Sequence, residues 1–455
     1  MLGNGTGLEP PARPTRVRWR IVGLLALFAL LCHFNRVSMA VAGTEHIIGK
    51  RGLSETQMGS VYSAYLLIYT ILMTPGGWWI DRRGPRAALL MMSFGSALFV
   101  ALTGAVGMVA RSAAVLLWGL LVVRGLLGSV TVPMHPGAAR MVSLWTPPTE
   151  RSRANGSVNA TALIGIALAP PGFGFLADHL GWPGAFVVGG AASAVLGAIW
   201  MLYARDGPRE HPSSNFEERR LVEADRAPLP GAGPDGPHGS GRLLGNRTLI
   251  LLTLSYAANN YFQYLFVYWI QYYFDSVLHL GKGQSRGYTT LAMLAMAAGM
   301  ASGGWISDRT EILLGTRRGR ALISILSMTL SALFLGMGIL GQGTAWIVAC
   351  FALAMGVLGI CEAAFWTSAT QVGERHGGMA AAIMNTGGNG GGLLAPIVTP
   401  LFASYFGWKG GLGLACGVSV IGALFWLWID PTRSSGGPEA MKPSRSTSAP
   451  PPGGP

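Results

Sequence analysis

The chain has 455 residues, of which 50% are hydrophobic and only 12% are charged, and its mean hydropathy is +0.42. A soluble globular protein carries about twice that fraction of charged residues, so the composition excludes an ordinary soluble domain. The formal net charge of +13 would suggest nucleic-acid binding in a soluble protein, but the distribution of the basic residues explains it differently.

Long apolar segments recur along the chain, and a helix needs roughly 20 residues to span a hydrocarbon core of about 30 Å. Segments of that length lie at about 19–43, 54–80, 86–110, 113–145, 151–177, 182–204, 247–274, 285–307, 320–341, 344–372, 378–406 and 408–429. They predict an all-α polytopic membrane protein with twelve transmembrane helices that cross a lipid bilayer.

The basic residues are distributed unevenly between the two sides of such a bundle. If the N-terminus is cytoplasmic, six of the 33 Lys and Arg residues lie in outward loops, three lie within spans and the other 24 face inward. This asymmetry follows the positive-inside rule. It predicts a cytoplasmic-membrane protein with both termini inside and no nucleic-acid partner.

A polar stretch rich in Pro and Gly divides the spans into two groups of six. The predicted organisation is a cytoplasmic tail at 1–18, a first half at 19–204, a linker at 205–245 with a short helix at 215–226, a second half at 246–430 and a disordered tail at 431–455. The four cysteines all lie inside spans, so we expect no disulfide framework and no metal site or cofactor.

Arg36 lies deep in the first span, in "LLALFALLCHFNRVSMAVAG". A charged side chain at that depth usually faces a cavity or a partner and marks a transport pathway. The alternative is an internal salt bridge, but the first six spans hold no Asp or Glu at comparable depth. Tyr65 and Tyr69 share a face of the second span, where they serve either interhelical packing or a ligand.

A short motif follows the second span of each half, "GGWWIDRRGPR" at 76–86 and "GGWISDR" at 303–309. Glycine pairs allow close packing at a helix end, and the repetition indicates a duplicated six-helix unit. The residues that we assign to these two loops are Gly77, Asp81, Arg82, Gly84, Arg86, Asp308 and Arg309.

Several other polar residues lie within apolar spans. Arg124 and His135 belong to the fourth span, and His33 lies one turn before Arg36. Those in the second half are Asn260, Tyr264, Glu362, Trp366, Asn385 and Asn389. Arg124 either faces a polar cavity or donates to backbone carbonyls of a neighbouring helix. The glycines around Asn385 and Asn389, in "NTGGNGGG", predict close helix contact, not a nucleotide loop.

The pattern Gly-x-x-x-Asp-Arg-x-Gly-x-Arg that begins at Gly77 resembles the signature loop of the major facilitator superfamily. Four further stretches resemble its anion:cation symporter family, which includes hexuronate, galactonate, glucarate, sialate and vesicular glutamate carriers. They are "NRVSMAVA", "RGLLG…HPGAARMVSLWTPPTERSRANG", "GWPGAF" and "FW…GERHGGMAAAIMNTGGNGGGLLAPIVTP".

The resemblance implies two six-helix halves around a central site and transport of a small organic anion. It implies that Arg36 binds the substrate carboxylate, and a guanidinium suits this role because it donates two parallel hydrogen bonds. It also implies that Arg124 and Tyr69 face the cavity and that asparagines of the eleventh span lie near substrate hydroxyls. We include Asn35, next to Arg36, in the candidate substrate site.

The sequence departs from the family at two positions. Proton-coupled members carry acids where this chain has Asn35 and Thr131, and neither side chain can take up and release a proton. Glu362, His135 and His33 are therefore the remaining candidates for proton coupling, although a glutamate or a histidine within a helix bundle is also a common structural residue.

We expect a monomeric secondary transporter that takes up a sugar acid or another carboxylate together with a proton. A uniporter or exchanger of an organic anion, and a membrane sensor derived from a transporter, are the alternatives. The chain lacks His-Glu-x-x-His and Gly-x-Ser-x-Gly motifs, so no enzyme is expected. Two deep arginines disfavour export of cations.

Overall fold

The computed structural model describes residues 13–223, 243–373 and 376–432, apart from the side chains of Thr74 and Asp81. Residues 1–12 and 433–455 of the predicted tails at 1–18 and 431–455, and residues 224–242 of the predicted linker, lie outside this part. The described residues form helices joined by short loops, with no β-strand among them.

The first half consists of α1 (Val17–Ala42), η1 (Gly43–Ile47), α2 (Glu55–Arg83), α3 (Pro85–Val109), α4 (Ala113–Thr131), α5 (Met134–Trp145), α6 (Pro148–Leu168), η2 (Ala169–Phe173) and α7 (Gly174–Tyr203). Two short elements follow it, η3 (Pro208–Glu210) and α8 (Phe216–Glu223). The second half consists of α10 (Arg247–Tyr272), η5 (Tyr273–Val277), α11 (Lys282–Leu314), α12 (Thr316–Leu340), α13 (Thr344–Ile360), α14 (Glu362–Gly373) and α15 (Gly377–Phe425).

The prediction of twelve spans is confirmed. Within the described residues, eight helical segments are long and apolar enough to cross a membrane. Pro148–Tyr203 and Gly377–Phe425 each contain two spans, because Gly181 and Gly407 turn the chain at a φ of 70°. The remaining two spans are α2 and α10, whose polar side chains lower their hydropathy.

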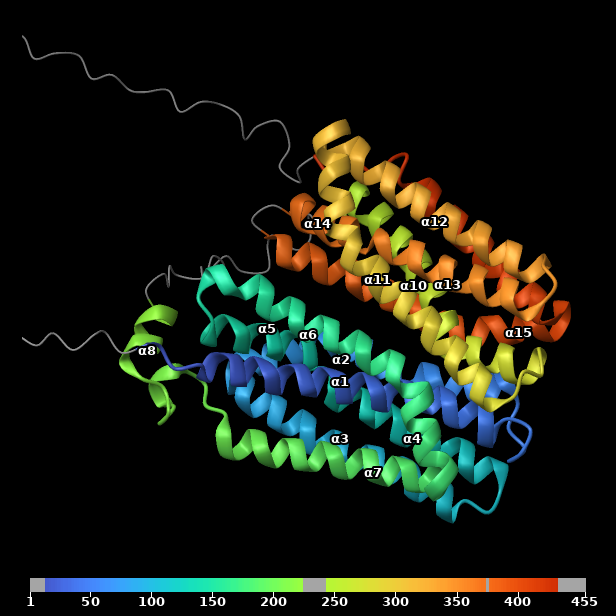
Figure 1. Cartoon of the computed structure of the whole chain (residues 1–455), viewed down its shortest axis with the longest axis horizontal. Helices are drawn as coiled ribbons and strands as arrows, with labels where there is room; N and C mark the ends of the chain where they lie inside the picture. The colour runs from blue at the N-terminus through green and yellow to red at the C-terminus, as the bar shows by residue number, and fades with distance from the viewer. Residues whose placement is uncertain (1–12, 224–242, 374–375, 433–455) are drawn as a thin grey trace, which may run out of the picture.

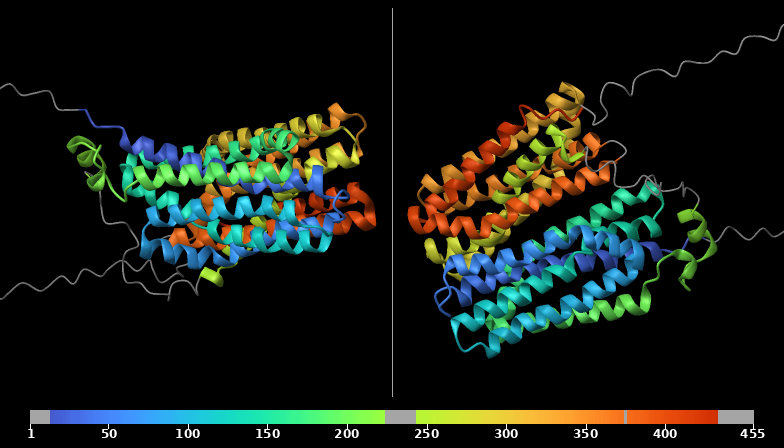
Figure 2. Two further views of the ribbon diagram at one scale, coloured as in Figure 1. Left: turned by 90° about the horizontal axis from the view of Figure 1, so that it is seen from below. Right: turned by 180° about the vertical axis from the view of Figure 1, so that it is seen from behind.

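The two halves form separate helical bundles, drawn from blue to green and from yellow to red in Figure 1. Their helices approach one another at the end that carries Glu45, between α1 and α2, and diverge towards the end that carries α8 (Figures 1 and 2). We call these two ends the Glu45 end and the α8 end.

The internal duplication predicted from the repeated motif is visible in the geometry. Arg82 stacks over Trp78 at 4.5 Å in the first half, and Arg309 stacks over Trp305 at 5.6 Å in the second. In each half a glycine at positive φ separates the helix of the motif from the next helix: Gly84 at 83°, within the first motif, and Gly315 at 77°, after the second. A side chain is strained in this backbone region, which explains glycine at both junctions.

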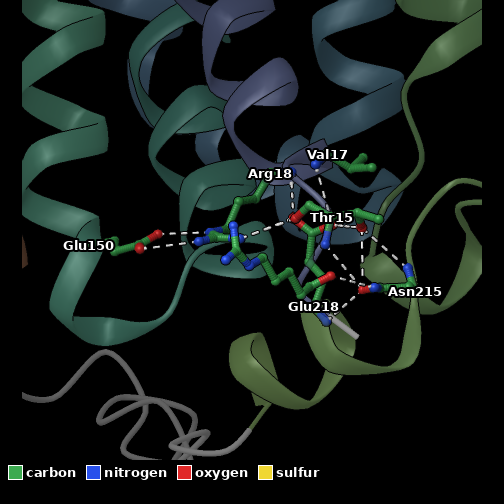
Figure 3. A network of polar contacts seen from close by, with 7 residues as sticks. Thr15, Val17, Arg18, Glu150, Asn215 and Glu218 are labelled. Atoms are coloured by element: carbon green, nitrogen blue, oxygen red, sulfur yellow. Dashed lines mark hydrogen bonds and ion pairs between the residues drawn. The ribbon is translucent and has the colours of Figure 1, made fainter. Parts of the chain in front are cut away.

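The described part of the predicted linker helix is α8, which begins at Phe216 and contacts the start of α1 (Figure 3). The buried carboxylate of Glu218 accepts hydrogen bonds from the Thr15 hydroxyl and from the backbone N–H groups of Val17 and Arg18. Arg18 also donates to Glu150 at 2.8 Å. The linker therefore supplies the cap that α1 lacks within its own sequence.

Candidate functional site

A cavity of about 550 Å³ lies between the two halves. This volume is within the range of roughly 300–1,000 Å³ that is typical of small-molecule sites. Nine of the predicted site residues line it: His33, Arg36, Tyr69, His135, Tyr264, Glu362, Trp366, Asn385 and Asn389. The cavity thus brings together residues that are far apart in the chain.

Arg36 contributes its guanidinium to this cavity from α1. Its Nε atom donates to Tyr268 Oη at 3.3 Å, and its Cζ atom lies 5.2 Å and 4.9 Å from the ring centroids of Tyr65 and Tyr264. Aromatic faces attract a cation without neutralising it. Among the described residues Arg36 forms no ion pair, so the internal salt bridge that would have explained it is not observed there.

Arg124 lies behind Arg36 and does not line the cavity. It is only 1% exposed, and it donates to the backbone carbonyl oxygens of Asn35 at 3.4 Å and Arg36 at 2.8 Å. This is the arrangement that we considered as the structural alternative. Its effect is to fix the backbone of α1 at the residue that carries the guanidinium.

Three other predicted substrate residues also lie outside the cavity lining. Asn35 donates to Ser193 Oγ of α7 at 3.1 Å, and Tyr65 shares a 2.7 Å hydrogen bond with Thr131. Asn260 is 6% exposed and lies against Gly388 of α15. Asn35 and Thr131, which occupy the positions of the family acids, therefore serve helix packing in this chain.

Glu362 forms part of the opposite wall, at the first residue of α14. It accepts hydrogen bonds from Tyr256 Oη at 2.7 Å, from Trp366 Nε1 at 2.8 Å and from Asn259 Nδ2 at 3.5 Å. The contact with α10 that we considered as a structural role is therefore present. The same side chain also faces the cavity, so the two roles coexist.

His33 and His135 form a pair on the first-half side of the cavity. Their ring centroids are 5.3 Å apart, with an interplanar angle of 69°. His33 Nδ1 lies 2.9 Å from the carbonyl oxygen of Ala29, one turn earlier in α1. The two rings are thus neighbours, a contact that the sequence did not predict.

Asn385 and Asn389 of α15 are four residues apart, and both line the cavity. Both amide groups lie within 3.9 Å of the sulfur of Met73 on α2. The adjacent glycines provide the close helix contact that we expected, since a Cβ added at Gly391 would meet the carbonyl oxygen of Ala257 on α10 at 1.9 Å.

The sequence analysis missed three cavity residues that carry side-chain amides: Asn155, Asn159 and Gln263. The two asparagines are one helical turn apart on α6. Both are polar residues within the predicted span at 151–177, and this polarity is the signal that could have identified them. Gln263 lies in α10 between Asn260 and Tyr264, which were both predicted as site residues. Its own polarity within an apolar span was the same kind of signal.

The residues of the signature loops lie away from the cavity lining, at the α8 end. Arg86 donates to the carbonyl oxygen of Met201 at 3.0 Å, and its backbone N–H donates to Asp206 at 3.3 Å. Asp81 is helical, but its side chain lies outside the described part of the structure. Gly77, Asp308 and Arg309 occupy the ends of α2 and α11.

Ion pairs link the two halves at the Glu45 end. Arg286 of α11 contacts Glu45 Oε2 and Asp178 Oδ2, each at 2.5 Å, and Gln271 donates to Glu45 at 2.8 Å. Glu45 is fully buried. The sequence analysis counted Arg286 only as a loop charge and missed this interaction.

Glu45, His46 and Asp178 have ligand atoms within 4.8 Å of one another. This spacing alone would allow a metal ion. Arg286 pairs with both carboxylates, and Lys282 lies 3.8 Å from Glu45, so the positive charge is already supplied by the protein. The cluster fits a latch between the halves better than a cation site. None of these residues belongs to the cavity lining, which includes Asn155 and Asn159 of α6.

The comparisons with known proteins agree with this architecture. The model of the Major Facilitator Superfamily matches residues 25–378 and 314–451. The probable galactarate/D-glucarate transporter GudP of Bacillus subtilis (strain 168) is 28% identical over 419 residues, which are 88% of this chain and 87% of that protein. The D-galactonate transporter of Escherichia coli O6:H1 is 25% identical over 429 residues, 92% of this chain and 96% of that protein.

A solved structure supports the fold independently. The crystal structure of a bacterial homologue of the human lysosomal transporter Spinster, in an inward-facing and unoccupied conformation, matches with a TM-score of 0.74. The match covers 92% of this chain and 98% of that one at 17% sequence identity.

Proposed function

The chain belongs to the major facilitator superfamily, and on that premise we propose that it is a secondary transporter of a small organic anion, of the sugar-acid class. The observation that carries the proposal is Arg36. A guanidinium that lines a cavity between two helical halves, with no ion pair to a described carboxylate, is suited to a carboxylate from the ligand.

The remaining lining supports a ligand with hydroxyl groups. Asn159, Gln263 and Asn389 present side-chain amides, each of which can donate and accept a hydrogen bond. Trp366 and Tyr264 add aromatic surface for the carbon skeleton. The two relatives are named as a galactarate/glucarate transporter and a galactonate transporter. Both names refer to polyhydroxylated acids, which supports a sugar acid as the ligand.

We propose alternating access as the transport cycle. In the state described here the Arg286 latch closes the Glu45 end, and the cavity extends towards the α8 end. Rocking of the halves around Arg36 would break the latch and close the α8 end. The excess of basic residues supports a cytoplasmic location for the α8 end and both termini, which makes this state the inward-facing one.

Coupling of uptake to a proton is the energy source that we propose. Glu362, His33 and His135 line the same cavity as Arg36, so a proton on any of them can affect, and be affected by, the bound anion. A uniporter or an exchanger is the second candidate, because Asn35 and Thr131 replace the family acids and are committed to hydrogen bonds with Ser193 and Tyr65.

The experiment is uptake by purified protein in liposomes, with labelled sugar acids, dicarboxylates and neutral sugars as a panel. We expect saturable uptake of at least one sugar acid and none of the neutral sugars. Uptake of neutral sugars, or a lack of uptake of every anion by protein that is folded, would refute the proposal. A membrane sensor would bind an anion in the same preparation without moving it.

A further inference from the structure

The cavity carries opposite charges on its two halves. Among the described residues that line it, Arg36 of α1 is the cationic side chain and Glu362 of α14 is the carboxylic acid. The histidine pair lies on the same side as Arg36, since His33 is one turn before it in α1. A ligand that bridges the halves therefore meets a different chemistry at each of its ends.

The hydrogen bonds of Glu362 suit an ionised carboxylate. Tyr256, Trp366 and Asn259 all donate to it, so both carboxylate oxygens act as acceptors. A carboxylate can accept about four hydrogen bonds. Oε1 receives two donors and Oε2 receives a single long one, which leaves Oε2 able to accept from the hydroxyl group of a ligand.

A second carboxylate on the ligand would be repelled by the charge of Glu362 at this wall. Two like charges at close range repel one another, and the repulsion is larger in a site that is partly shielded from water. The guanidinium of Arg36 is already assigned to the first carboxylate. The other side chains of the described lining that can carry a positive charge, His33 and His135, lie on the side of Arg36 and not at the wall formed by Glu362.

We infer that the ligand is a polyhydroxylated monocarboxylate of the aldonate type, and that Glu362 rejects the corresponding dicarboxylates. The single carboxylate binds Arg36, the hydroxyl groups meet the amides of Asn159, Gln263 and Asn389, and the terminal hydroxyl donates to Glu362. This inference rests on the proposed function and goes beyond it, because the named relatives include carriers of both a monoacid and diacids.

The test is a comparison of two matched pairs, D-galactonate with galactarate and D-gluconate with D-glucarate. The members of each pair share their carbon number and inner hydroxyl groups and differ in whether the last carbon is an alcohol or a carboxylate. Affinities are measured by calorimetry on the purified full-length protein at pH 7.5. We expect the preferred hexonate to bind at least tenfold more tightly than its hexarate.

The variant Glu362→Gln keeps hydrogen-bonding capacity and removes the charge. We expect it to reduce the ratio of hexonate to hexarate affinity by about tenfold, whereas Glu217→Gln, which removes an equal charge on α8, leaves the ratio as in wild type. An unchanged ratio in folded Glu362→Gln would overturn the role of Glu362. If that variant does not fold, the ratio of hexonate to hexarate affinity in the wild type decides whether the ligand is a monocarboxylate.

Equal or tighter binding of the hexarates by the wild type overturns the inference while the proposed function stands. The same conclusion follows if another carboxylate of the uptake panel binds and no hexonate does. If no organic anion binds at all, the proposed function fails together with the inference.

Discussion

Glu218 accepts a hydrogen bond from the backbone N–H of Arg18 at 3.0 Å, so that a residue 200 positions further along the chain caps the first transmembrane helix. The side chain of Arg16, at the N-cap position, makes no such bond. Exposed N–H groups at a helix start are satisfied by water or by side chains, and here a buried carboxylate does so. The cap couples the beginning of the linker to the first half.

Replacement of Glu218 by alanine should therefore destabilise the first half. Loss of a helix cap costs about 0.5–2 kcal/mol, and Arg18 would also lose one of its two acidic partners. We expect a lower midpoint in thermal unfolding of the purified protein. Glu217→Ala is the control, since the ion pair of Glu217 among the described residues is a 3.9 Å contact with Arg220 at the surface of α8. Identical midpoints for the two variants would contradict the capping role.

The Arg36→Lys variant should lose transport while it retains expression and fold. Lysine keeps the positive charge but cannot offer two parallel donors to a carboxylate. We expect a reduction of at least a hundredfold in the rate of anion uptake at low concentration, and a similar loss for Arg36→Ala. Arg309→Lys is the control at the α8 end, outside the cavity lining. Wild-type uptake by well-folded Arg36→Ala would eliminate the carboxylate-binding role.

The Arg286→Gln variant should open the Glu45 end. Arg286 bridges two carboxylates that belong to different helices of the first half, and its removal leaves Glu45 buried without its strongest partner. Breaking a buried ion pair costs several kcal/mol. We expect a cysteine at Thr44, in a background that lacks the native cysteines, to react at least fivefold faster with a water-soluble maleimide.

Asp178→Asn provides the graded comparison for the latch. The Asp178 side chain is 41% exposed, whereas the Glu45 side chain is fully buried. An exposed pair contributes little to stability, typically up to about 1 kcal/mol. The labelling rate in Asp178→Asn should therefore lie closer to that of the wild type. Equal rates in wild type and Arg286→Gln would show that the ion pairs do not hold this end closed.

The stability of the protein should fall below pH 6.5 partly because of His211, which lies between the last helix of the first half and α8. Burial against Trp145 and Tyr203, together with the nearby charge of Arg205, lowers the pKa of His211 below the usual 6.5. The unfolded chain thus binds a proton more readily than the folded one.

It follows that the stability associated with neutral His211 is present above pH 6.5 and is lost as the pH falls towards the lower pKa of the folded state. We expect the difference in unfolding midpoint between pH 7.5 and pH 5.5 to be smaller in His211→Gln than in wild type. The measurement is thermal unfolding in detergent at both pH values. An equal difference in the two proteins would exclude His211 as a contributor.

Energy coupling is tested by accumulation of substrate under an imposed pH gradient in proteoliposomes. With proton coupling, the wild type should concentrate the anion above equilibrium, and Glu362→Gln or His135→Asn should equilibrate it without accumulation. Equilibration by the wild type would indicate a uniporter or exchanger. Accumulation that survives both substitutions would exclude these two residues as the coupling site.

Much of this fold could be predicted because its signals are local in the sequence. Apolar segments of about 20 residues predicted the spans, and the motif repeated after the second span of each half predicted the duplication. Arg36 was identified for the same reason, since a charge within an apolar run is conspicuous. These signals depend only on hydropathy and on backbone conformation.

The parts that could not be predicted depend on which helix faces which. Arg124 and Arg36 look alike in sequence, yet one binds backbone carbonyls and the other lines the cavity. Arg286 was indistinguishable from an ordinary loop charge until the fold placed it beside Glu45. The roles of such residues are set by contacts between helices that are far apart in the sequence, and a local sequence pattern does not reveal these contacts.

The π-helical turn η1 holds Glu45 at the end of the same helix that carries Arg36. A π turn contains more residues than an α turn, and one inserted residue rotates the later part of the helix by about 100° around the axis. The direction in which Arg36 points from the helix axis is therefore set by α1, whereas the direction of Glu45 is set by the π turn η1 that follows. Deleting one residue from Gly43–Ile47 would turn the segment after it away from its partners and leave the guanidinium oriented as before.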